Sequence, residues 1–86
     1  MRHFTSKRFW DCFNSLPKRI QNLATENYKL LKQDPEHPSL NFKHVCQGRF
    51  RSVRVGVHYR ALGVPVPEGV QWFWIGTHAE YDVLIG

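Results

Sequence analysis

The sequence has little of what marks extracellular or membrane-spanning proteins. Its two cysteines, Cys12 and Cys46, show no motif spacing that would predict a disulfide framework or a redox pair. No apolar run approaches the roughly 20 residues that span a bilayer. The first residues lead into a charged segment, not into the apolar core of a signal peptide. These absences predict a soluble, cytoplasmic protein with reduced thiols and no membrane partner.

Several kinds of catalytic site are missing as well. The Cys and His residues lack the paired short spacings of zinc sites, and His44 with Cys46 forms a single close pair without a second one. There is no glycine-rich loop that could cradle a phosphate, and no serine nucleophile elbow. The sequence therefore predicts neither a metal nor a cofactor.

Size, composition and charge bound what remains. The 86 residues predict one small domain spanning residues 1–86, and 42% hydrophobic with 14% aromatic residues are enough for a packed core. Twelve Lys and Arg against seven Asp and Glu give a net charge of +5. Such a balance favours an anionic partner, such as nucleic acid or an acidic protein, although a merely basic soluble protein would have the same charge.

The first half of the chain has helical patterns. Thr5 or Ser6 can cap a helix that runs to about Asn14, and Pro17 opens a second helix that runs to about Gln33. The second helix has apolar residues at spacings of three and four, including Leu16, Ile20, Leu23, Ala24, Leu30 and Leu31. We expect the two helices to form an antiparallel hairpin that covers an apolar surface.

The second half has strand patterns. After a proline-containing loop at residues 34–38, strands are predicted over residues 41–46, 49–55, 57–62 and 70–75, with a proline-rich turn at 63–69. Thr77 and Glu80 have the spacing of a capping box, which predicts a short helical turn through Leu84. The predicted fold class is α+β, with a two-helix hairpin packed on one face of a four-stranded, mainly antiparallel sheet.

Cationic and titratable residues gather in this second half. Cleavage of RNA by its own 2′-hydroxyl needs a base, an acid and a group that stabilises charge on phosphorus. His78 is the best proton-transfer candidate, because imidazole titrates near neutrality, and Arg54 and Arg60 suit a phosphate. If the middle strand runs straight through Gly56, residues 54, 58 and 60 share a face, but Gly56 could also break that alternation.

Each of these residues also has a structural interpretation. Glu80 could act as a base, but the capping box already explains it. Tyr81 could stack on a base or donate a proton, or it could simply close the core. The aromatic run Trp72, Phe73 and Trp74 could stack on bases, although an apolar run favours the core.

In combination, these segments resemble the RelE/ParE toxin superfamily. The resemblance covers nearly the whole chain and rests on residues 16–21 (LPKRIQ), 34–35 (DP), 37–40 (HPSL), 42–43 (FK), 52–56 (SVRVG), 59–62 (YRAL) and 74–82 (WIGTHAEYD). It implies the toxin of a type II toxin–antitoxin pair with a two-helix, four-stranded fold. RelE-like members cut mRNA in the ribosomal A site without a metal, whereas ParE-like members poison DNA gyrase.

The resemblance also implies roles for individual residues. Arg60 matches the arginine of the middle strand, Arg51 and Arg54 approximately match basic positions before it, and His78 falls where a catalytic Arg or His follows the last strand. The implied catalytic residues are Arg60, His78 and Tyr81, and the implied RNA-binding residues are Lys43, Arg49, Arg51 and Arg54. The C-terminal helix and terminal tyrosine of many RelE-like toxins have no clear counterpart before Gly86.

The function expected from this resemblance is a ribosome-dependent mRNA endonuclease. Its partners would be a cognate antitoxin, the ribosome and mRNA, and it would assemble as a homodimer or as a hetero-oligomer with the antitoxin. Two alternatives stay open from the sequence: a non-enzymatic gyrase inhibitor, and a non-toxic binding module with the same fold.

Overall fold

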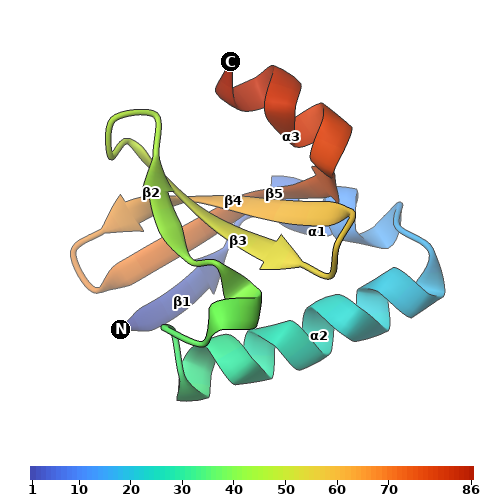
Figure 1. The fold of residues 1–86 in the computed structure, drawn as a ribbon, viewed down its shortest axis with the longest axis horizontal. Helices are drawn as coiled ribbons and strands as arrows, with labels where there is room; N and C mark the ends of the chain where they lie inside the picture. The colour runs from blue at the N-terminus through green and yellow to red at the C-terminus, as the bar shows by residue number, and fades with distance from the viewer.

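The computed structural model describes all 86 residues as a sheet with helices on both faces. Helices α1 (Lys7–Asn14) and α2 (Lys18–Gln33) lie on one face, and α3 (His78–Ile85) lies on the other (Figure 1). A 3₁₀ turn, η1 (Pro38–Leu40), joins α2 to the strands. The strands are β1 (Arg2–Thr5), β2 (Lys43–Val45), β3 (Phe50–Val55), β4 (Tyr59–Val66) and β5 (Gly69–Thr77). None of the helices is both long enough and apolar enough to cross a bilayer.

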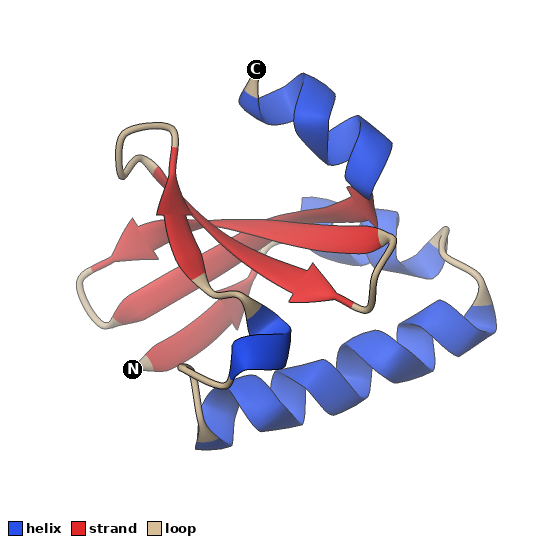
Figure 2. Ribbon diagram, in the orientation of Figure 1, coloured by secondary structure: helices blue, strands red, loops and turns tan.

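The strand order β1-β5-β4-β3-β2 confirms the α+β class but adds a strand to the expected four (Figure 2). Neighbours from β2 to β5 are antiparallel, whereas β1 runs parallel to β5 with Arg2 opposite Gly69. β1 has only four residues, which is too short for a recognisable alternation of apolar and polar residues. Its partner β5 lies near the other end of the sequence. Gly69 permits the contact, because a Cβ there would collide with the backbone of Arg2.

The proline-rich turn predicted for residues 63–69 is wrong. β4 continues to Val66, the turn is confined to the residues before Gly69, and the two strands form a long hairpin. The last pair between β3 and β4 is Arg51 with Gly63, so β4 has a single neighbour where Pro65 lies. A proline is tolerated in such a position, because its missing N–H can fall on the open side.

The hairpin of β4 and β5 contains a bulge at Phe73. Leu62 pairs with Trp74 and Gly63 pairs with Trp72, so Phe73 has no partner in β4. Residues two apart in a regular strand share a face, and an extra residue breaks that rule. The bulge therefore sends Trp72 to the face covered by α1 and α2, and Trp74 to the face covered by α3.

Each face of the sheet consequently has its own core. The core under α1 and α2 comprises Leu31, Leu40, Val53, Val55, Ala61, Val70, Trp72 and Ile75. The smaller core under α3 comprises Leu62, Trp74 and Tyr81, with Val45, Phe50, Phe73 and Ile85 packed around it. The larger core is incompletely filled, because an open apolar cavity of about 650 Å³ lies between the helices and the sheet.

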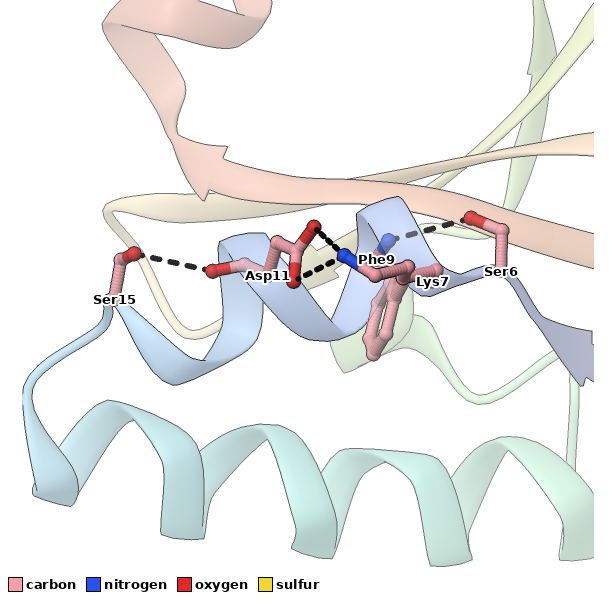
Figure 3. A network of polar contacts seen from close by, with 5 residues as sticks. All are labelled: Ser6, Lys7, Phe9, Asp11 and Ser15. Atoms are coloured by element: carbon pink, nitrogen blue, oxygen red, sulfur yellow. Dashed lines mark hydrogen bonds and ion pairs between the residues drawn. The ribbon is translucent and has the colours of Figure 1, made fainter.

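Helix α1 begins and ends with polar contacts (Figure 3). Ser6 accepts a hydrogen bond from the Phe9 amide at 3.3 Å, which confirms Ser6 as the N-cap. Lys7 pairs with Asp11 at 3.1 Å, and the Ser15 hydroxyl donates to the Asp11 carbonyl at 3.1 Å. These contacts fix a helix of eight residues that would be marginal alone.

Gly63 is expected to tolerate no side chain. A Cβ there would lie 2.5 Å from Val70 Cγ1 and 2.9 Å from Trp72 Cε3. Gly63→Ala should therefore lower the free energy of unfolding by roughly 1–3 kcal/mol, measured by chemical denaturation. Gly86→Ala is the control, because nothing lies within 4 Å of a Cβ at that terminal residue. Equal stability of the two variants would contradict the packing described for the bulge.

The stability of the protein should fall as His3 is protonated. Trp72 Nε1 donates to His3 Nδ1 at 3.1 Å, and burial lowers the pKa of His3, as do the N-terminal amino group and Lys32. The unfolded chain takes up this proton near the ordinary pKa of 6.5, and the folded protein only at lower pH. The contribution of neutral His3 to the free energy of unfolding is therefore fully present above pH 6.5. It is lost as the pH falls through the lower pKa that His3 has in the folded protein.

Thermal unfolding measured above and below pH 6.5 tests the effect of His3 protonation on stability. His3→Gln is the matched control, because a glutamine oxygen can accept from the indole N–H but does not titrate. The difference in Tm between wild type and His3→Gln should change with pH. Below pH 6.5 the Tm of the wild type should fall relative to that of His3→Gln. A constant difference would show that His3 does not stay neutral in the folded protein.

Candidate functional site

A row of cationic residues lies on the α3 face of the sheet. Arg54 and Arg60 are cross-strand partners, so their side chains lie on the same face, and Arg60 is also opposite Gly76 in β5. The chain between β3 and β4 turns at Gly56, whose φ of 65° is in the left-handed region. Gly56 therefore breaks the strand, so His58 lies in the turn, while Arg54 and Arg60 still share a face.

Arg60 is the buried member of this row. Its side chain is 9% exposed, and Nη1 donates to the carbonyl oxygens of Val57 at 3.1 Å and Tyr59 at 2.7 Å. Burial lowers the pKa of Arg60, and Arg54 lowers it further, while Tyr81 and Asp82 act in the opposite direction. A guanidinium stays charged in proteins, so Arg60 presents a fixed, poorly solvated positive charge.

His78 reaches the same face from the start of α3. Thr77 caps this helix, and the His78 amide donates to the His58 carbonyl at 2.8 Å, which holds the helix start beside the β3–β4 turn. The imidazole is half exposed, with Nε2 lying 3.3 Å from Asp82 Oδ1. Nδ1 makes no contact with a protein hydrogen-bonding group, so it remains available to a bound molecule.

Glu80 and Tyr81 are engaged elsewhere. Glu80 Oε1 accepts from the Thr77 amide at 3.0 Å and from its hydroxyl at 2.8 Å, and these bonds lower the pKa of Glu80. This confirms the capping box and keeps the carboxylate ionised. Tyr81 is 4% exposed within the second core, and its hydroxyl has no hydrogen-bond partner. A ring buried in this way cannot stack on a base without a movement of α3.

The other predicted cations are more scattered. Arg51 is three residues before Arg54 in β3, so the two side chains lie on opposite faces of the strand. The guanidinium of Arg51 donates to the carbonyls of Gly48 at 2.9 Å and Phe50 at 3.3 Å and so stabilises the β2–β3 turn. Lys43 is opposite Ser52 and therefore shares the face of Arg54. Arg49 is exposed in the turn before β3. The structure thus places Arg54, Arg60, His78 and Lys43 on the α3 face, with Tyr81 buried in the core on that face, and leaves Arg51 outside.

Asp82 belongs to this site and was missed from the sequence. Its carboxylate contacts His78 from one helical turn away. The spacing of four residues between His78 and Asp82 was the available signal, because such residues meet on a helix surface. The short helical turn predicted through Leu84 contained both residues, and the structure has a full eight-residue helix there.

The arrangement has the parts that chemistry on a phosphodiester needs. Two arginines supply permanent positive charge, and an imidazole oriented by a carboxylate can hold or release a proton. No group of three or more His, Cys, Asp or Glu residues lies close enough together to hold a metal ion.

The fold is similar to that of chains in solved RelB–RelE antitoxin–toxin complexes. Among solved structures, it is similar to a chain of the RelB–RelE antitoxin–toxin complex from Methanococcus jannaschii, with 12% identity over 96% of this chain and 99% of that chain, and a TM-score of 0.73. The RelE–RelB complex from Pyrococcus horikoshii OT3 has 17% identity over 88% and 92%, with a TM-score of 0.66. A copper-bound mutant toxin from Helicobacter pylori has 16% identity over 93% and 97%, with a TM-score of 0.63. At these identities the likeness shows the fold.

Family membership comes from the sequence profile of the ParE-like toxin domain, which matches residues 18–83. The chain therefore belongs to the ParE-like toxin domain family and, with it, to the RelE/ParE toxin superfamily. A search of curated proteins gave no significant match.

Arg54 and Arg60 should differ in their importance for stability. Arg60→Met removes two charge-assisted hydrogen bonds to carbonyl groups and should cost about 1.5–3 kcal/mol. Arg54→Met changes an exposed side chain and should alter stability by less than about 0.5 kcal/mol. Urea denaturation of both variants measures the difference. Equal losses would mean that Arg60 is not held by the β3–β4 turn.

Proposed function

We propose that this protein is the toxin of a toxin–antitoxin pair that cleaves mRNA on the ribosome without a metal. The observation that carries the proposal is the convergence of Arg54, Arg60 and a carboxylate-oriented His78 on one sheet face. Membership in a toxin-domain family supports the toxin role. A gyrase inhibitor needs a complementary surface but no proton-transfer group, so the His78–Asp82 pair favours the nuclease.

In the proposed reaction the RNA supplies its own nucleophile. The 2′-oxygen bonds to phosphorus as the bond to the 5′-oxygen breaks, which leaves a 2′,3′-cyclic phosphate and a 5′-hydroxyl. One proton leaves the 2′-hydroxyl and one reaches the departing 5′-oxygen. His78 carries out one of these transfers through Nδ1, because Nε2 faces Asp82.

The arginines act on the charge that develops at phosphorus. Arg54 is exposed and can meet the phosphate first, whereas Arg60 is fixed by the β3–β4 turn. A preoriented charge in a poorly solvated position stabilises a transition state without reorganising. Tyr81 has its hydroxyl buried, so it would contribute after a shift of α3, or serve as the support beneath Arg60.

The antitoxin is the second proposed partner. The solved structures with this fold include toxins bound to antitoxins, and the net charge of +5 suits an acidic segment. Such a segment laid over Arg54 and His78 would compete with RNA for the same face. Assembly would then be a hetero-oligomer with the antitoxin, or a homodimer in its absence.

Loss of His78 should abolish cleavage and leave the fold intact. In bacteria that express the toxin from an inducible promoter, His78→Ala should lower the yield of new mRNA 5′ ends by roughly 10²–10⁴-fold and relieve growth arrest. His58→Ala is the matched control, because His58 contacts the site only through its backbone carbonyl. Both variants should unfold near the wild-type Tm.

The other outcomes lead to different functions. Arrest that persists in His78→Ala, or arrest without new 5′ ends, would replace the nuclease by a protein inhibitor such as a gyrase poison. No arrest by the wild type would favour a non-toxic binding module of the same fold.

A further inference from the structure

The bulge at Phe73 exposes part of an aromatic ring on the α3 face of the sheet. Phe73 is unpaired in β4, and its ring lies 5.6 Å from the ring of Phe50, with an angle of 56° between the planes. Both side chains are half-buried and pack against the second core, which holds their positions while part of their surface stays exposed. Bulges commonly re-aim a side chain in this way next to functional sites.

A cation lies beside this pair of rings. Arg8, on α1, has its guanidinium carbon 5.9 Å from the centroid of Phe73. Arg8 forms no ion pair, and the carboxylate of Asp11 on the same helix pairs with Lys7 (Figure 3). Lys43, on the same face, and Arg49, next to Phe50, are also exposed and unpaired. The rings are thus accompanied by positive charge that no acidic side chain balances.

The aromatic pair lies along β5 from the arginine row. Gly76, opposite Arg60, follows Phe73 by three residues, which corresponds to about 10 Å along a strand. This is roughly the rise of three stacked nucleotides at 3.4 Å each. A single strand whose scissile phosphate lies at Arg60 would therefore place a base about three nucleotides away at Phe73.

From this geometry we infer that Arg8, Phe50 and Phe73 form a subsite that stacks on a base of single-stranded RNA about three nucleotides from the cleavage site. The inference rests on the proposed function, which supplies the RNA. Half-exposed aromatic rings with adjacent cations bind nucleobases by stacking and cation–π contacts, with little sequence preference. An acidic protein would be attracted by the same charges but gains nothing specific from an open ring face.

The test separates stacking on bases from attraction to phosphates. Phe73→Leu keeps an apolar side chain for the second core but removes the ring. Binding of a short fluorescent oligoadenylate, followed by anisotropy, should weaken by at least about fivefold, the lower end of what one stacked base contributes. Binding of inorganic polyphosphate, which has charge but no bases, should not change.

Two further variants complete the test. Phe42→Leu is the matched control, because Phe42 packs on Trp72 at the opposite face, and its oligoadenylate affinity should equal that of the wild type. Arg8→Gln should weaken the binding of both polyanions and reduce their salt dependence. Each variant is first compared with the wild type in thermal unfolding.

Unchanged oligoadenylate affinity in Phe73→Leu, or an equal loss for polyphosphate, would overturn the subsite and assign the patch to a protein partner. If His78→Ala stops cleavage in cells while Phe73→Leu binds normally, the proposed nuclease stands without the subsite. If Phe73→Leu weakens oligoadenylate binding and the wild type cuts no mRNA, the surface binds RNA but the nuclease proposal fails.

Discussion

The bulge at Phe73 gives the sheet two apolar faces, and most of the structure depends on it. Without the extra residue, Trp72 and Trp74 would share a face, and one of the two cores would lose its tryptophan. With it, Trp72 fills the core beneath α1 and α2 and Trp74 fills the core beneath α3. Gly63, opposite the bulge, leaves room for the ring of Trp72. A single backbone irregularity therefore explains why a chain of 86 residues can hold helices on both sides of its sheet.

The second core has a direct consequence for the candidate site. Tyr81 anchors α3 to Leu62 and Trp74, and this contact fixes where the helix begins. The capping box of Thr77 and Glu80 then sets His78 beside the β3–β4 turn, within reach of the row formed by Arg54 and Arg60. Arg54 and His78 are exposed and Arg60 is buried, while Tyr81, which holds α3 against the sheet, lies in the second core. Tyr81 therefore has a structural role, although its buried hydroxyl has no hydrogen-bond partner.

Much of the fold was predictable because its signals are local. The cap at Ser6, the proline before α2, the apolar periodicity of α2 and the Thr77–Glu80 capping box each act within one or two turns of chain. β1 was missed because it is short and its pairing with β5 joins the two ends of the sequence. The extension of β4 through Pro65 was missed because a proline is acceptable there only when the neighbouring strand has already ended.

For the candidate site, the sequence by itself determined the types of residue: a histidine after the last strand, arginines in the middle strands and a positive net charge. The tertiary structure alone decided which of them meet. Strand register placed Arg54 opposite Arg60 and turned Arg51 toward the β2–β3 turn, helix geometry joined His78 to Asp82, and packing buried Tyr81. The physical reason is that residue chemistry is a property of each position, whereas register, bulges and burial result from contacts between segments far apart in the chain.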